Sequence, residues 1–205
     1  LGFEFVGVNY YDGQGFMVPR DLGVSSAMEL DGATVCIQTG TTTELNLADF
    51  FRANNISYEP VPIETNAEAQ QQYLAGACDV YTTDASGLAA TRATFEDPSA
   101  HVILPEIISK EPLGPLVRHG DNEWGDIVRW TLNALIAAEE LGVTSANIDD
   151  LAAAPGDNPE INRLLGTEGG LGEMIGLDSD WAVRAIKAGG NYGEIFAQNI
   201  GEATP

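Results

Sequence analysis

The chain has 205 residues, 44% of them hydrophobic, and a formal net charge of -22 that comes from 31 acidic residues against nine lysines and arginines. This length and composition indicate a globular protein of one domain or two small lobes and exclude a disordered chain. The acidic charge repels phosphate backbones and excludes nucleic-acid binding, and no apolar run has the roughly 18 to 20 residues that predict a membrane span.

Between Ala33 and Thr83, short β-rich runs alternate with helical segments, a pattern typical of βαβ units. The first strand reads ATVCI, and the segment Thr41–Asn54 is predicted to be a helix. Within it, Thr41 and Glu44 have the spacing of a capping box. The next strand reads SYEPVPI, and its prolines predict a place near an edge of the sheet.

The same alternation continues to the middle of the chain. A second helix is predicted over Asn66–Ala75 and ends at Gly76, which is a common terminating residue. A buried strand, CDVYTT, a third helix, ASGLAATRATF, and a strand, HVILPEII, follow it. These elements predict an α/β fold with a small, mostly parallel sheet and flanking helices.

Beyond the connection KEPLGPLVRHGD the character of the chain changes. The segment Asn122–Leu141 carries apolar residues at helical spacing and predicts a long amphipathic helix. Shorter helices follow it to the C-terminus, with no strand of comparable strength. The three tryptophans, Trp124, Trp130 and Trp181, lie at helical positions, and we expect them in a core.

Two polar segments follow neighbouring predicted strands at the edge where parallel α/β sheets bind ligands. Gln38–Thr43 offers threonine hydroxyls, a glycine and the free N–H groups of a helix start, which suit a carboxylate. Thr82–Asp84 offers one carboxylate, which suits an ammonium group. Together they match an α-amino-acid zwitterion. The alternative is that Thr41 and Asp84 merely cap the helices that follow them.

No residue pattern predicts catalysis. The chain has no GxSxG, HExxH or P-loop motif, and neither histidine, His101 or His119, has a Cys, Ser or second His in a recognisable relation to it. We interpret both as surface or structural residues, and we predict no metal site. Cys36 and Cys78 lack the spacing of a CxxC motif, which leaves either one bridge or two buried thiols.

Five segments, in order, resemble the family 3 periplasmic solute-binding proteins of ABC amino-acid importers: VNYYDGQGFMV, QTGTTTELNLADFF, CDVYTTDASGL, HVILPEIISKEPLGPLVRHGD and NYGEIFAQNIG. The similarity is greatest to the general L-amino-acid-binding proteins, which serve glutamate, glutamine, aspartate and asparagine. The resemblance implies a two-lobed clamp of the type II periplasmic-binding-protein fold, whose N-terminal part of lobe one the chain does not match. It implies four parts: residues 1–15 as the end of lobe one and the first crossing, 16–108 as lobe two, 109–119 as the return crossing, and 120–205 as the C-terminal helices of lobe one.

The resemblance also assigns site residues. Gly40, Thr41 and Thr42 fall on the family's positions for the ligand α-carboxylate, and Asp84 falls on the position for the α-ammonium. The family's clamping arginine and aromatic lid belong to the unmatched part and are not carried over.

Further expectations follow from the same resemblance. It implies an L-amino-acid ligand and no cofactor, ABC permease subunits in the inner membrane as partners, and a monomer that is not an enzyme. It also implies the periplasm of a Gram-negative bacterium. Because the sequence opens in a strand without a methionine, we expect a processed or truncated piece that does not include the signal peptide. Because that compartment is oxidising, we expect a disulfide between Cys36 and Cys78. Two alternatives share the fold: the ligand-binding domain of a membrane receptor and a cyclohexadienyl-dehydratase-like enzyme.

Overall fold

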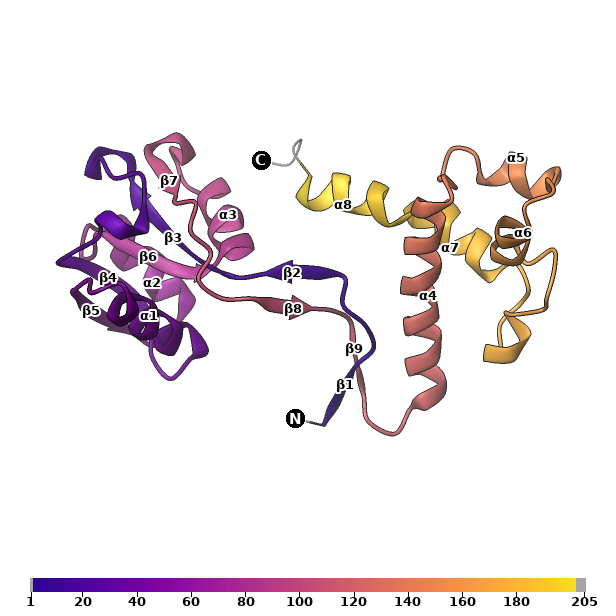
Figure 1. The fold of residues 1–205 in the computed structure, drawn as a ribbon, viewed down its shortest axis with the longest axis horizontal. Helices are drawn as coiled ribbons and strands as arrows, with labels where there is room; N and C mark the ends of the chain where they lie inside the picture. Colours follow the sequence, from indigo (N-terminus) through magenta and orange to yellow (C-terminus); the bar gives the residue numbers. More distant parts are fainter. Residues whose placement is uncertain (1, 202–205) are drawn as a thin grey trace. The chain divides into compact units, whose positions relative to one another are not determined.

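The computed structural model describes residues 2–201, and these divide into two compact units. Tyr10–Leu113 forms the first, here called the sheet unit. The residues up to Asn9 and those from Gly114 onward form the second, called the helical unit. Figure 1 labels the elements of both units. Among the described residues, no helix is both long and apolar enough to cross a membrane.

The sheet unit contains a five-stranded sheet with the order β5-β4-β6-β3-β7. Its strands are β3 (Gln14–Pro19), β4 (Ala33–Gln38), β5 (Tyr58–Ile63), β6 (Val80–Asp84) and β7 (His101–Ile103). Strand β4 runs parallel to β5 and β6, whereas β3 lies antiparallel between β6 and β7. The predicted α/β class is confirmed, and the sheet is mixed because β3 inserts against the common direction.

Strand β3 is the element that sequence reasoning missed. The resemblance placed its first two residues in the first crossing, and no strand was predicted over the segment QGFMVP. The strand is nevertheless central and almost wholly buried, with Phe16 and Val18 on one face and Met17 on the other. The edge position of β5 is confirmed, whereas β7 is shorter than the predicted strand HVILPEII.

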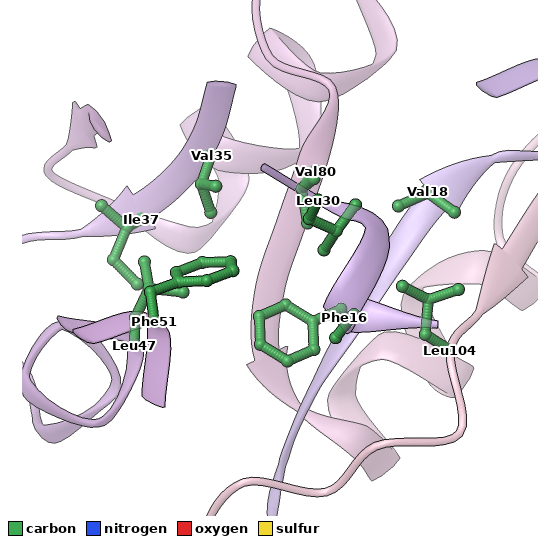
Figure 2. Packing of buried hydrophobic residues seen from close by; sticks show 10 residues of the cluster. Phe16, Val18, Leu30, Val35, Ile37, Leu47, Phe51, Val80 and Leu104 are labelled. Carbon is green, nitrogen blue, oxygen red and sulfur yellow. The ribbon is translucent and has the colours of Figure 1, made fainter. Parts of the chain in front are cut away.

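Three helices flank this sheet: α1 (Thr42–Ala53), α2 (Asn66–Leu74) and α3 (Ala85–Ala93). Helix α1 covers one face, where Leu47 and Phe51 pack with Phe16 and Ile37 (Figure 2). Helices α2 and α3 cover the other face through Tyr73, Leu88 and their neighbours. The alternation of side chains along each strand thus gives the unit a core on both faces. Short 3-10 turns lie at Arg20–Leu22, Ala27–Glu29 and Pro98–Ala100.

Two short ribbons flank the points where the units divide. In the sheet unit, β2 (Tyr10–Asp12) pairs antiparallel with β8 (Glu111–Leu113). In the helical unit, β1 (Phe3–Phe5) pairs antiparallel with β9 (Leu116–Arg118). Each ribbon therefore joins segments that are about a hundred residues apart in the chain.

The helical unit is built on α4 (Asn122–Glu140), whose bounds match the predicted helix closely. Shorter helices follow: α5 (Ile148–Ala153), α6 (Pro159–Leu165), a 3-10 turn (Glu173–Ile175), α7 (Trp181–Gly189) and α8 (Tyr192–Ile200). Its core consists of Ala138, Val143, Ile148, Leu165 and Ile186.

The tryptophan prediction was wrong for two of the three residues. Trp124 is 53% exposed and Trp130 is 51% exposed, whereas Trp181 is half-buried. Trp130 and Trp181 line a hollow of about 380 Å³ in the helical unit. The apolar surface of α4 is wider than the short helices of its own unit can cover. Helical spacing identifies an apolar face, but it does not say what covers that face.

Candidate functional site

The start of α1 is built by a short loop after β4. Gly40 has a positive φ of 71°, a conformation that glycine adopts without strain, and it turns the chain into the helix. Thr41 is the N-cap: its hydroxyl oxygen accepts from Glu44 N–H at 3.4 Å and its hydroxyl donates to the Gln38 carbonyl at 2.7 Å. The Glu44 carboxylate returns to Gly40 N–H at 2.9 Å. This arrangement differs from the predicted capping box in one bond. The Glu44 carboxylate accepts from the N–H of Gly40, one residue before the N-cap, and not from that of Thr41.

In this geometry the three residues predicted to bind a ligand carboxylate differ in which of their groups are free. The N–H of Gly40 is bonded to Glu44, and the hydroxyl of Thr41 is bonded to the backbone. Thr42 is exposed and is the first helical residue, so its N–H and that of Thr43 have no partner within α1. An anion that approaches the start of α1 therefore finds these two N–H groups and the positive end of the helix dipole.

Asp84 ends β6 and occupies the N-cap position of α3, yet its side chain makes no capping hydrogen bond. Asp12 provides the cap instead. Its Oδ1 accepts from Gly13 N–H at 2.8 Å and from Ser86 N–H at 3.3 Å, and its Oδ2 accepts from the Ser86 hydroxyl. The alternative that Asp84 merely caps α3 is therefore wrong.

The carboxyl of Asp84 lies in an acidic surrounding. Burial raises its pKa, and the nearby carboxylate of Glu111 and, to a lesser degree, that of Asp12 raise it further. The ion pairs of the described residues include none of these three carboxylates. The amine of Lys110, adjacent in sequence to Glu111, lies over the ring of Tyr11 at 4.8 Å. The site therefore combines partial burial with uncompensated negative charge.

Gln14 links the two halves of the candidate site. It is fully buried, and its Nε2 donates to the Thr43 carbonyl in α1 at 3.1 Å and to Thr82 Oγ1 in β6 at 2.9 Å. Its backbone N–H donates to Ser109 Oγ at 2.8 Å, and the Ser109 hydroxyl donates to Glu111 Oε1 at 2.6 Å. The start of α1 and the end of β6 are therefore held at fixed positions through one side chain.

Sequence reasoning missed Asp12, Gln14 and Glu111. Asp12 reaches Ser86 across 74 residues, and Gln14 reaches Thr82 across 68. No local pattern marks such partners. The only available signal was the polar run YYDGQG, which interrupts an otherwise apolar strand pattern.

The expected disulfide is confirmed: Cys36 in β4 is bonded to Cys78, which lies just before β6. Their Cα atoms are 5.6 Å apart, within the usual range for a bridge. Both residues belong to the core cluster that α2 and α3 cover. The bridge ties together the two strands whose ends carry the candidate site.

His101 lies outside the candidate site. Its Nδ1 is 2.8 Å from the Tyr73 hydroxyl, and its ring packs against that of Phe95 at a centroid distance of 4.8 Å. Burial lowers the pKa of His101. These contacts give it a structural role, which agrees with the sequence interpretation.

Comparison with known proteins gives matches along the entire chain. It is 68% identical to the glutamate/glutamine/aspartate/asparagine-binding protein BztA of Rhodobacter capsulatus and 58% identical to the general L-amino acid-binding periplasmic protein AapJ of Rhizobium johnstonii. Both alignments cover 100% of this chain and 60% of the relative. No protein-family model matches.

Among solved structures, a periplasmic binding protein of an ABC transporter from Brucella ovis with glutathione bound superposes with a TM-score of 0.92. It is 54% identical in sequence, and the match covers 100% of this chain and 64% of that one. The chain is thus a homologue of the periplasmic amino-acid-binding proteins and has their fold, and it spans about 60% of the length of its curated relatives.

Proposed function

We propose that the chain carries half of the ligand site of a periplasmic binding protein, which captures an L-amino acid for import by an ABC transporter. The observation that carries this proposal is the juxtaposition of two receptors at one edge of the sheet. The start of α1 follows β4 and Asp84 ends β6, and these strands are parallel neighbours. An anion receptor and an uncapped carboxylate therefore lie at the same edge.

The two receptors match the two charged groups of an amino-acid backbone. The ligand α-carboxylate binds at Gly40, Thr41 and Thr42, chiefly through the N–H groups at the start of α1 and the Thr42 hydroxyl. The Gly40 N–H joins them when the carboxylate of Glu44 moves aside. The α-ammonium binds the carboxylate of Asp84, where it offsets the negative charge that Glu111 and Asp12 add.

The relatives supply the proposed ligand class and location. BztA is named for glutamate, glutamine, aspartate and asparagine, and AapJ for L-amino acids in general. We propose the same range for the protein that contains this chain, with permease subunits in the inner membrane as its partners and the periplasm as its location. It acts as a monomer and releases its ligand unchanged. The disulfide of the sheet unit supports an oxidising compartment.

The division into units supports a two-lobed clamp. In this proposal residues 16–108 are lobe two, residues 1–15 and 109–119 contain the crossings, and residues 120–205 belong to lobe one. The observed units divide at Asn9 and Leu113, within the proposed crossings. The exposed apolar surface at Trp124 and Trp130 is then the part of lobe one that packs against the segment present only in the longer relatives.

Calorimetric titration of the full-length protein with L-glutamate, L-glutamine and L-aspartate tests the proposal. We expect binding to the wild type and its loss in Asp84→Ala, with the fold checked by circular dichroism. The 205-residue chain alone should bind weakly or not at all, because it holds half of the site. Absence of heat with every amino acid would contradict the proposal, and turnover of prephenate or arogenate would favour the enzyme instead.

A further inference from the structure

Within residues 2–201, the acidic groups beside Asp84 form no ion pair with a cation, and they are not equivalent. The two oxygens of Asp12 are bonded at the start of α3, where they accept from Gly13 and Ser86. Glu111 differs, because it accepts from Ser109 through Oε1 and its carboxyl also shares a side-chain hydrogen bond with that of Asp84. Among the described residues, Glu111 is therefore the carboxylate that meets Asp84 directly, so a donor that reaches one of the two also lies beside the other.

The backbone fixes where Glu111 lies. It is directly opposite Asp12 in the β2–β8 ribbon, and Asp84 is directly opposite Gln14 in the β3–β6 ladder. Asp12 and Gln14 are separated by a single residue, so β2 leads directly into β3 and the two pairs, which lie on different strands, follow each other closely. This places Glu111 beside the end of β6, where its charge acts on Asp84.

A second observation, independent of the acidic charges, comes from Gln14. Its side chain is fully buried, its Nε2 is satisfied twice, and its Oε1 has no hydrogen-bond partner in the described residues. Residues directly opposite in a ladder have Cβ atoms about 4.5 to 5.5 Å apart and share one face, so the side chain of Gln14 begins next to that of Asp84. A buried acceptor without a donor is uncommon, and this one adds to the excess of acceptors in the neighbourhood of Asp84.

We infer that Glu111 is a second carboxylate of the cation receptor, so that the ligand ammonium is held between Asp84 and Glu111. This inference rests on the proposed function and deepens it. An ammonium group has three N–H donors, and a single carboxylate does not use them all. A primary ammonium therefore has enough donors for both carboxylates, whereas a quaternary ammonium has none.

The test uses the full-length protein and L-glutamine as the probe. In Glu111→Gln the amide has the shape of the carboxylate and still accepts from Ser109, so the fold is retained while the charge is lost. We expect L-glutamine to bind about tenfold more weakly, since a hydrogen bond to a charged group contributes on that order. Glu59→Gln removes the same charge from an exposed position on β5 and serves as the matched control, with affinity unchanged.

The pH dependence separates charge from a merely structural effect. Affinity should fall as the pH drops through the pKa of Asp84, because a protonated carboxyl no longer attracts the ammonium. The groups that face Asp84 are Asp12 on β2, Glu111 on β8 and the Tyr81 hydroxyl on β6. Glu111→Gln removes one of the two repulsive carboxylates, so the fall in affinity should begin at a lower pH than in the wild type.

The outcomes separate this inference from the proposed function. If Glu111→Gln binds L-glutamine like the wild type with the same pH profile, while Asp84→Asn loses binding, the second carboxylate is refuted and the amino-acid site stands. If the wild type itself binds no amino acid, both fail. Weaker binding together with a shifted pH profile supports the inference.

Discussion

The carboxylate of Asp12 accepts the backbone N–H of Ser86 at 3.3 Å, so the first turn of α3 is capped by a residue of β2 and not by its own N-cap residue. This arrangement frees Asp84 from a structural bond. It also ties the β2–β8 ribbon to the sheet, because Asp12 ends β2 while Ser86 belongs to α3. The capping carboxylate and the proposed ligand-binding carboxylate are thus different residues, and their replacements should have different effects.

Asp12→Ala should lower the free energy of unfolding by about 1 to 2 kcal/mol, the usual cost of losing an N-cap side chain. The reason is that Gly13 N–H and Ser86 N–H both lose their acceptor. Urea unfolding followed by far-ultraviolet circular dichroism measures the change, and hydrogen exchange should show faster opening of α3. Asp84→Ala is the matched control, because Asp84 makes no cap bond. An equal loss in both variants would contradict the assignment of the cap.

Asp84 should destabilise the fold at neutral pH. Burial and the nearby carboxylates raise its folded-state pKa above the unfolded value, so the folded protein holds the proton longer. Between the unfolded and the folded pKa, the folded state binds more protons, and stability falls as the pH rises. Asp84→Asn should therefore have a higher urea midpoint than the wild type at neutral pH. The difference should shrink below the unfolded pKa of about 4. A lower midpoint for Asp84→Asn at neutral pH would contradict this reasoning.

His101 should make stability depend on pH in the opposite sense. Burial lowers its folded-state pKa, while Asp97 opposes and Arg92 adds to that shift. The unfolded chain then binds a proton more readily, so stability is lost as the pH falls through the unfolded pKa of about 6.5. Burial also raises the pKa of Tyr73, which keeps its hydroxyl protonated and able to donate to His101.

Replacement by a ring that does not titrate checks this expectation. His101→Phe should keep the packing against Phe95 and reduce the drop in urea midpoint between about pH 8 and about pH 5.5. His119→Phe is the control, because His119 is exposed on the other unit. If both variants retain the wild-type pH dependence, His101 does not contribute to it.

Some of these features could be predicted from local sequence and others could not. The bounds of α1 and α4 follow from apolar spacing and caps, and the edge position of β5 follows from its prolines, because these signals act within a few residues. Strand β3 could not be assigned in this way. Its place between β6 and β7 depends on partners that are far away in the sequence.

The candidate site shows the same division. Gly40, Thr41 and Thr42 come shortly after the end of β4, and Asp84 is the last residue of β6, so their position at the sheet edge could be predicted. The cap by Asp12 and the network of Gln14 depend on pairs separated by tens of residues, which a single sequence does not reveal. The prediction that the tryptophans of α4 are buried was wrong for a related reason, since an apolar helix face does not show which part of the protein packs against it.

Removing the disulfide should destabilise the sheet unit. Cys36 and Cys78 close a loop with a sequence separation of 42, and a native bridge over such a loop typically contributes about 2 to 4 kcal/mol. The double variant Cys36→Ser, Cys78→Ser should therefore unfold at a lower urea concentration than the oxidised wild type, which should show no reactive thiol when denatured without reductant. Two titratable thiols in that sample would refute the bridge.

Gln14→Leu should uncouple the two halves of the site. The change removes the Nε2 donor from the Thr43 carbonyl and from Thr82 Oγ1, so two polar groups lose a partner in the interior. Each such loss costs about 1 to 3 kcal/mol, partly offset because the unpartnered Oε1 of Gln14 is removed as well. We therefore expect a net destabilisation of about 1 to 3 kcal/mol in urea unfolding. The exposed Gln71→Leu should change stability by no more than about 0.5 kcal/mol.

The same variant should also affect ligand binding in the full-length protein. Because Gln14 fixes the start of α1 relative to the end of β6, its loss lets the carboxylate and ammonium receptors move independently. L-Glutamine should then bind more weakly to Gln14→Leu even under conditions where the variant is fully folded. Gln14→Glu also lacks the Nε2 donor and adds a third carboxylate near Asp84, besides Asp12 and Glu111, so it should destabilise the fold more than Gln14→Leu does. A folded Gln14→Leu variant with wild-type affinity would show that the two receptors are positioned without this side chain.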